Sequence, residues 1–200
     1  MRRPGVSQHQ IFFEDETGVN RHTLRRNYGR GARRGQAPVA PTVEEPRGAH
    51  HSVLIGMSST RIIASETQVQ RRGVGTKGAE FARFVEYKLG PAMLESARTA
   101  GVAPTEPLFL ILDNASIHHT KDVQAAAARV SSRIVLTYLP PYASTMNPVE
   151  LLNSDLKAAM RRRETTGGAT LRNVISRCLR EDLRDSSTRF GGYYRHCGWY

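Results

Sequence analysis

The chain of 200 residues has only two cysteines, Cys178 and Cys197, and a single tryptophan. No Cys-x-x-Cys or His-x-x-x-His spacing accompanies the cysteines, so the sequence does not support a zinc site. No run approaches the ~20 apolar residues that a membrane span requires. The basic N-terminus is not followed by the apolar core of a signal peptide. These absences predict a cytoplasmic protein with no membrane partner, in which a disulfide would not persist.

Acidic residues are also scarce, because 18 Asp and Glu stand against 29 Lys and Arg, a formal net charge of +11. Such an excess favours a polyanionic partner, since cationic side chains displace the counterions condensed on phosphates. DNA is the first candidate, which would make the protein nucleoid-associated; a basic protein without such a partner is the alternative. Residues 18–36 carry six arginines and no acid, interrupted by glycines. This stretch is either a solvated loop or a contact to DNA phosphates, and the residues predicted to make that contact are Arg25, Arg26, Arg30, Arg33 and Arg34.

The periodicity of apolar residues and the positions of glycine and proline predict strands and helices along the rest of the chain. The predicted strands are 9–15, 51–58, 61–69, 108–113 and 133–138, with the second and third forming a hairpin. The predicted helices are 76–100, broken at Pro91, then 121–130, one from Pro148, and 171–183. This order fits an α/β fold in which helices flank a mixed sheet.

Three acidic residues stand in distinctive settings within this pattern. Asp15 ends the first apolar run, on the same strand face as Ile11 and Phe13. Asp113 directly follows the buried run 108–112, and Glu150 lies in the first turn of the helix expected from Pro148. Carboxylates from two strand ends and one helix start can converge to hold divalent cations for phosphodiester chemistry. For Glu150 alone, a simple helix-start acid is the alternative.

The helix that begins near Pro148 has an apolar stripe and a neighbouring polar stripe. The polar stripe includes Glu150, Lys157 and Arg161, so this helix can pack on the core and still present cations to a phosphate backbone. Glu14 and Glu16 point to the strand face opposite Asp15, which makes them poorer metal ligands.

Taken together, these motifs resemble the DDE transposases of the mariner superfamily, in its bacterial insertion-sequence branch. The matching segments are Asp15-Glu16-Thr17, residues 112–119 (LDNASIHH) and residues 139–150 (LPPYASTMNPVE). Asp113 and Glu150 are separated by 36 residues, close to the spacing of that superfamily. Residues 152–157 and 33–36 resemble the bacterial branch. The resemblance runs from about Phe12 to Arg163.

The resemblance implies a ribonuclease-H-like fold and a metal-dependent DNA strand cleavage and strand transfer. Asp15, Asp113 and Glu150 would be catalytic and would bind two Mg²⁺ ions, for which Mn²⁺ can substitute. Like-charge repulsion among them would raise at least one pKa without metal. Supporting roles are expected for three residues: Asn114 near the metals or as a turn residue, His118 on a phosphate or a carboxylate, and Asn147 in the turn that aims Glu150.

One departure from the family concerns its N-terminal part, because only fourteen residues precede Asp15. We therefore expect the N-terminal DNA-reading domain to be missing. The chain is expected to consist of a catalytic domain over 1–166 and a helical, aromatic tail over 167–200. The tail aromatics would dock on the body or stack on DNA bases. A homodimer or a full-length transposase is the expected protein partner. The alternatives are a catalytically silent, basic DNA-binding remnant and a ribonuclease-H-like nuclease acting on RNA hybrids or junctions.

Overall fold

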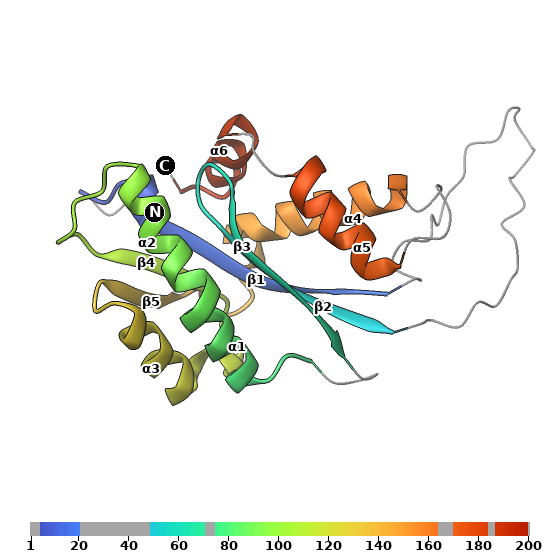
Figure 1. Ribbon diagram of the computed structural model, residues 1–200. Helices are drawn as coiled ribbons and strands as arrows, with labels where there is room; N and C mark the ends of the chain where they lie inside the picture. The colour runs from blue at the N-terminus through green and yellow to red at the C-terminus, as the bar shows by residue number, and fades with distance from the viewer. Residues whose placement is uncertain (1–4, 21–48, 71–74, 164–169, 184–186, 200) are drawn as a thin grey trace, which may run out of the picture.

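The computed structural model describes residues 5–20, 49–70, 75–163, 170–183 and 187–199. A five-stranded mixed sheet with the strand order β3-β2-β1-β4-β5 lies at its centre (Figure 1). The strands are β1 (Ile11–Val19), β2 (His50–Met57), β3 (Ile62–Gln70), β4 (Leu108–Leu112) and β5 (Ile134–Tyr138). β1, β2 and β3 pair antiparallel, whereas β4 pairs parallel with β1, and β5 parallel with β4. The predicted order of strands and helices along the chain and the predicted hairpin are confirmed, whereas the order of strands within the sheet comes from the structure.

The first strand is longer than the sequence pattern predicted. β1 runs to Val19, and its last residues pair with β2. Its pairing with β4 covers only Ile11 to Phe13, where Phe13 is opposite Ile111. Asp15 therefore does not end a strand. It follows the point at which β1 and β4 separate, and the same register continued by two residues would set Asp15 opposite Asp113.

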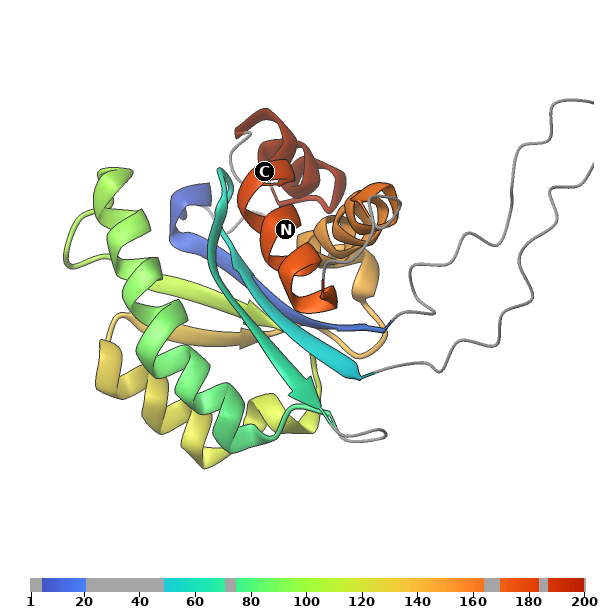
Figure 2. The same ribbon diagram turned by 45° about the vertical axis from the view of Figure 1, so that its right-hand side comes forward.

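Helices cover both faces of the sheet, as Figure 2 shows. One layer holds α1 (Gly78–Phe84), α2 (Gly90–Thr99) and α3 (Lys121–Val130), and the other holds α4 (Pro148–Arg163), α5 (Leu171–Arg177) and α6 (Ser187–His196). Alternation along β1 divides the core between them. Phe12 packs into the cluster of the first layer and Phe13 into that of the second. None of the helices in these described parts is long and apolar enough to cross a membrane.

The long helix predicted over 76–100 is interrupted by a π-helical segment, Val85–Leu89, and α2 begins after it with Gly90 and Pro91. The first helical residue is Gly78, because the Lys77 N–H donates to Glu80 Oε2 at 2.9 Å and so closes the first turn. Leu89 of the π-helical segment reaches Gly56 of β2 so closely that a Cβ there would lie 2.2 Å from its Cδ1. A larger residue at this position would therefore displace the Leu89 side chain from its contact with the sheet.

The C-terminal aromatics pack on the body of the protein. Tyr194 of α6 is fully buried, donates its hydroxyl to the Ile11 carbonyl at 2.8 Å, and meets Phe13 edge-on at 5.2 Å. The Trp199 Nε1–H donates to the Met146 carbonyl at 2.6 Å. The described tail therefore shares the core of the second layer. The proposed division at 166/167 lies in 164–169, outside the described residues, and stays a prediction.

Candidate active site

One cavity collects all three predicted acids. It has a volume of about 320 Å³ and is lined by Asp15, Asp113 and Glu150. β1 supplies the first, the residue after β4 supplies the second, and the first turn of α4 supplies the third. The separation of β1 and β4 opens the sheet at this point, so residues far apart in the chain face one space.

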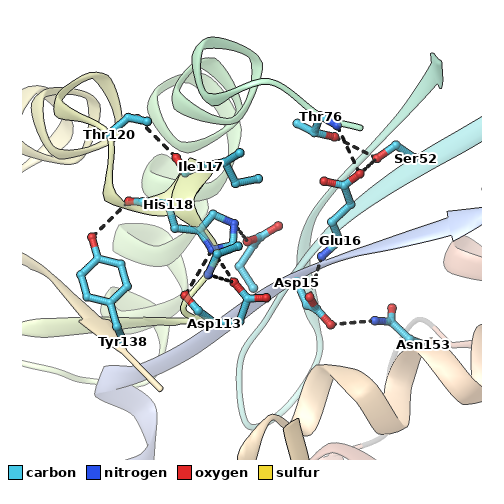
Figure 3. A network of polar contacts seen from close by, with 12 residues as sticks. Asp15, Glu16, Ser52, Thr76, Asp113, Ile117, His118, Thr120, Tyr138 and Asn153 are labelled. Atoms are coloured by element: carbon cyan, nitrogen blue, oxygen red, sulfur yellow. Dashed lines mark hydrogen bonds and ion pairs between the residues drawn. The ribbon is translucent and has the colours of Figure 1, made fainter. Parts of the chain in front are cut away.

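Asp15 is the most buried of the three, with 9% of its surface exposed. Its Oδ1 accepts the Glu16 N–H at 2.9 Å, and its Oδ2 accepts Asn153 Nδ2 at 3.1 Å (Figure 3). Burial, followed by repulsion from Glu150, raises the pKa of Asp15 from 3.8 to about 7, while the backbone N–H of Glu16 opposes the rise. Repulsion from Asp113 adds a smaller increase. Repulsion was expected to raise a pKa here, but burial is the larger cause.

Asp113 has the opposite electrostatic environment. Its side chain is 47% exposed, and its Oδ1 lies 2.8 Å from Nδ1 of the buried His118 (Figure 3). The hydrogen bond from His118 is the main reason that the pKa of Asp113 falls below its ordinary value, and the Ala115 N–H at 2.9 Å contributes. The structure therefore places His118 on a carboxylate, one of the two partners expected for it.

Behind His118 lies a carboxyl group that sequence reasoning did not assign to the site. Glu14 is fully buried, and its Oε2 is 4.0 Å from His118 Nε2. Neither Glu14 oxygen nor His118 Nε2 has a hydrogen-bond partner among the described residues. Burial, with added repulsion from Asp15 and Asp113, raises the pKa of Glu14 well above its ordinary value. Strand alternation correctly put Glu14 on the face away from Asp15, but only the fold brings it to His118.

Glu16 does not line the cavity, and its side chain points toward Ser52 and Thr76 (Figure 3). Its Oε1 accepts the hydroxyl of Ser52 on β2 and the backbone N–H of Thr76 at 3.4 Å. Thr76 therefore joins the sheet to the loop before α1. The helix predicted to begin at residue 76 therefore begins two residues later, and Lys77 occupies its N-cap position.

Asn147 and Asn114 have structural contacts next to the acids. Asn147 is buried, and its Oδ1 accepts the Val149 N–H at 3.2 Å, so it caps α4 and sets the position of Glu150. Asn114 is exposed on the cavity wall, and its Oδ1 lies 2.8 Å from His119 Nε2.

Two further residues of α4 bind acidic side chains. Asn153 is buried with only 3% of its surface exposed, and it donates to Asp15. Arg163, at the end of the helix, binds Asp182 through Nε at 2.7 Å and Glu181 through Nη2 at 2.8 Å.

The predicted DNA-contact residues divide into two groups. Lys157 and Arg161 are half-buried on α4. The five arginines of the N-terminal stretch, Arg25, Arg26, Arg30, Arg33 and Arg34, lie outside the described residues.

The donor chemistry of the cavity fits a hard divalent cation, because all three acids offer oxygen ligands of the kind that Mg²⁺ and Mn²⁺ take. A cation would also relieve the repulsion that contributes to the raised pKa of Asp15. Within the described ranges, however, no group of three His, Cys, Asp or Glu side chains is close enough to form a closed ligand set. The three carboxylates share a cavity without yet converging on one point.

Comparison with known proteins gives the family and the fold. Residues 10–172 match the family model described as DDE superfamily endonuclease. The catalytic domain of Mos1 mariner transposase has a TM-score of 0.63 at 14% identity, over 95% of this chain and 78% of that one. The Mos1 paired-end complex with Mn has a TM-score of 0.67 at 15% identity, over 96% and 53% of the two chains.

A more distant match is a simian T-cell lymphotropic virus intasome, with a TM-score of 0.52 at 16% identity, over 90% and 49% of the chains. No curated protein matches the sequence. The chain thus spans most of the Mos1 catalytic domain, but only about half, 52–53%, of the chains in a pre-cleavage Mos1 transpososome and in the paired-end complex. These likenesses show that the mixed sheet has the ribonuclease-H-like arrangement of that domain.

Proposed function

This chain belongs to the DDE superfamily endonucleases, and we propose that it cleaves DNA strands and joins them to new sites in the transposition of an insertion sequence. The observation that carries the proposal is the shared cavity of Asp15, Asp113 and Glu150, in which proximity contributes to raising the pKa of Asp15. The description of the family gives the class of reaction, and the cavity is where that reaction would take place.

We assign the metal ligands to Asp15, Asp113 and Glu150, holding two Mg²⁺ ions or Mn²⁺ in their place. Bound there, the ions would lower the pKa of an attacking water or 3′-hydroxyl and neutralise the leaving oxygen. Mos1 catalytic-domain structures have been solved with each of these metals. The protein's own contribution would be to keep the three carboxylates at one cavity, where a bound cation can draw them together.

Each carboxylate has its own support for that task. Asn153 and the Glu16 N–H hold the two oxygens of Asp15. His118 holds Asp113, and the turn at Asn147 directs Glu150. Asp15 must lose its proton to act as a ligand, and a cation in the cavity would favour that loss.

Binding of DNA is supported by the net charge of +11 and by the neighbours named as a transpososome and a paired-end complex. We assign phosphate contacts to Lys157 and Arg161 of α4 and to the N-terminal arginines. Neutralising phosphates releases counterions, so binding should weaken steeply with salt. The protein partner would be a second copy or a full-length transposase.

The test is nicking of supercoiled plasmid with Mg²⁺ or Mn²⁺. Asp15→Asn, Asp113→Asn and Glu150→Gln keep side-chain size and remove the charge, and each should abolish nicking. Glu106→Gln is the matched control, because Glu106 is an exposed acid that does not line the cavity. Nicking that survives Asp113→Asn would refute the assigned site. Salt-sensitive DNA binding without any nicking would identify a catalytically silent DNA-binding remnant. Preferential cleavage of RNA hybrids or junctions would identify a nuclease with those substrates instead.

A further inference from the structure

A tyrosine at the mouth of the acidic cavity has an unusual backbone conformation and an uncovered ring. Tyr142 lines the cavity together with the three acids. Its exposed fraction is 104%, so the ring is covered by nothing in the described chain. Its φ is +61°, and it is the only described residue other than glycine with a positive φ.

The backbone conformation follows from a tight turn between β5 and α4. The Ala143 N–H donates to the Pro140 carbonyl at 3.2 Å, which makes Pro141 and Tyr142 the two central residues. Proline suits the first central position, while a positive φ at the second normally calls for glycine or asparagine. A tyrosine there has an energetic cost that those residues avoid.

No contact of the Tyr142 side chain with the described residues offsets this energetic cost. The Tyr142 ring takes part in no ring contact or hydrogen bond with the described residues. Three other large apolar side chains are exposed, Val69, Tyr87 and Val135, and none of them lines the cavity. The combination of strain, exposure and position at the acids is therefore peculiar to Tyr142 within the described chain.

The backbone that carries this ring is constrained on both sides. Pro140 and Pro141 restrict the chain before it, and the 3-10 helix Ser144–Met146 follows immediately. The Trp199 side chain binds the Met146 carbonyl and fastens that helix to the body. An aromatic ring on a rigid turn loses little conformational freedom when a ligand stacks on it.

We propose that Tyr142 is a stacking platform for an unpaired DNA base next to the phosphate that enters the cavity. The inference rests on the proposed function, since it takes the phosphodiester to lie at Asp15, Asp113 and Glu150. A base adjoining that phosphate would emerge at the cavity mouth, where the exposed ring offers an aromatic face. Stacking tolerates every base, so Tyr142 would bind strand ends without reading sequence.

The first experiment measures stacking directly. A duplex with a short 3′ overhang carries 2-aminopurine as its first unpaired base, and Ca²⁺ replaces Mg²⁺ to prevent cleavage. Wild-type protein and Tyr142→Phe should quench the fluorescence at saturation, whereas Tyr142→Asn should not. Loss of the ring should weaken binding of the overhang roughly 5- to 150-fold, the usual contribution of one stacked base. Tyr87→Ala, which removes an exposed tyrosine elsewhere, should behave as wild type.

Two further readouts separate stacking from a structural role. Tyr142→Asn relieves the backbone strain, so its Tm should rise by roughly 2–4 °C while stacking is lost. An overhang with an abasic analogue at the test position should bind wild type and Tyr142→Asn equally. Equal quenching and affinity of wild type and Tyr142→Asn would overturn the proposal, as would absence of quenching by the wild type.

The outcomes for the two proposals are distinguishable. If carboxylate-dependent nicking is observed but Tyr142→Asn quenches as wild type does, only the stacking role fails. If quenching depends on Tyr142 but no variant or wild type nicks plasmid, stacking stands and the cleavage activity fails.

Discussion

Replacing Asp15 by Asn should stabilise the metal-free protein while abolishing its activity. The folded state raises the pKa of Asp15 from 3.8 to about 7, mainly by burial and then by repulsion from Glu150. In the unfolded chain this carboxyl loses its proton near pH 4, but in the folded protein it keeps the proton until about pH 7. Between these values the folded state binds more protons, so the free energy of unfolding falls as the pH rises.

The size of the effect follows from that shift. About three pKa units at ~1.4 kcal/mol each give a cost of about 4 kcal/mol, complete above pH 7. An asparagine carries no charge and avoids this cost. It should also keep the local contacts, because its Oδ1 can accept the Glu16 N–H and its Nδ2 can donate to Asn153 Oδ1, which now has no partner among the described residues.

The assay is urea unfolding between pH 4 and pH 8 in EDTA. The Asn variant should be more stable than wild type by up to about 4 kcal/mol at pH 8, with the difference vanishing near pH 4. Asp122→Asn, which changes an exposed acid in the first turn of α3, is the control. Added Mg²⁺ should stabilise the wild type and not Asp15→Asn. A variant that is less stable at pH 8, or a difference that does not depend on pH, would refute the reasoning.

Three further predictions concern the contacts around the site. His118→Ala should raise the pKa of Asp113, because it removes the main hydrogen bond to that carboxylate. The Mg²⁺ concentration needed for nicking should then rise roughly 10- to 100-fold, as it does when a metal ligand loses its supporting hydrogen bond. An unchanged Mg²⁺ requirement would contradict a positioning role for His118. Glu14→Gln should stabilise the fold at pH 8. Burial raises the pKa of Glu14, so the wild type loses stability as the pH rises above the ordinary pKa of glutamate, whereas glutamine does not titrate. A stability difference in urea unfolding that does not depend on pH would count against this prediction. Tyr194→Phe should lower the free energy of unfolding by about 1 kcal/mol, since the partly buried Ile11 carbonyl loses the hydrogen bond from the tyrosine hydroxyl, and the metal dependence should not change.

The sequence determined the elements and the chemical class of the site, because both depend on local patterns. Alternation along β1 correctly put Ile11 and Phe13 on one strand face, because both pack in the same core cluster. Apolar runs correctly located β4 and β5, and the proline at 148 correctly located the start of α4. The motifs around Asp113 and Glu150 identified the family, since they are contiguous and specific.

Only the tertiary structure decided what surrounds each acid, because those neighbours come from distant parts of the chain. The separation of β1 from β4 after Phe13 opens the cavity beside Asp15, and no local pattern shows where two paired strands part. Asn153 reaches Asp15 across 138 positions of sequence, and Tyr194 reaches Ile11 across 183. The pKa of Asp15 likewise depends on burial in the folded protein and on repulsion from Glu150 and Asp113, which are distant in sequence. Local patterns specify which carboxylates are present, whereas their protonation and support depend on packing, which is nonlocal.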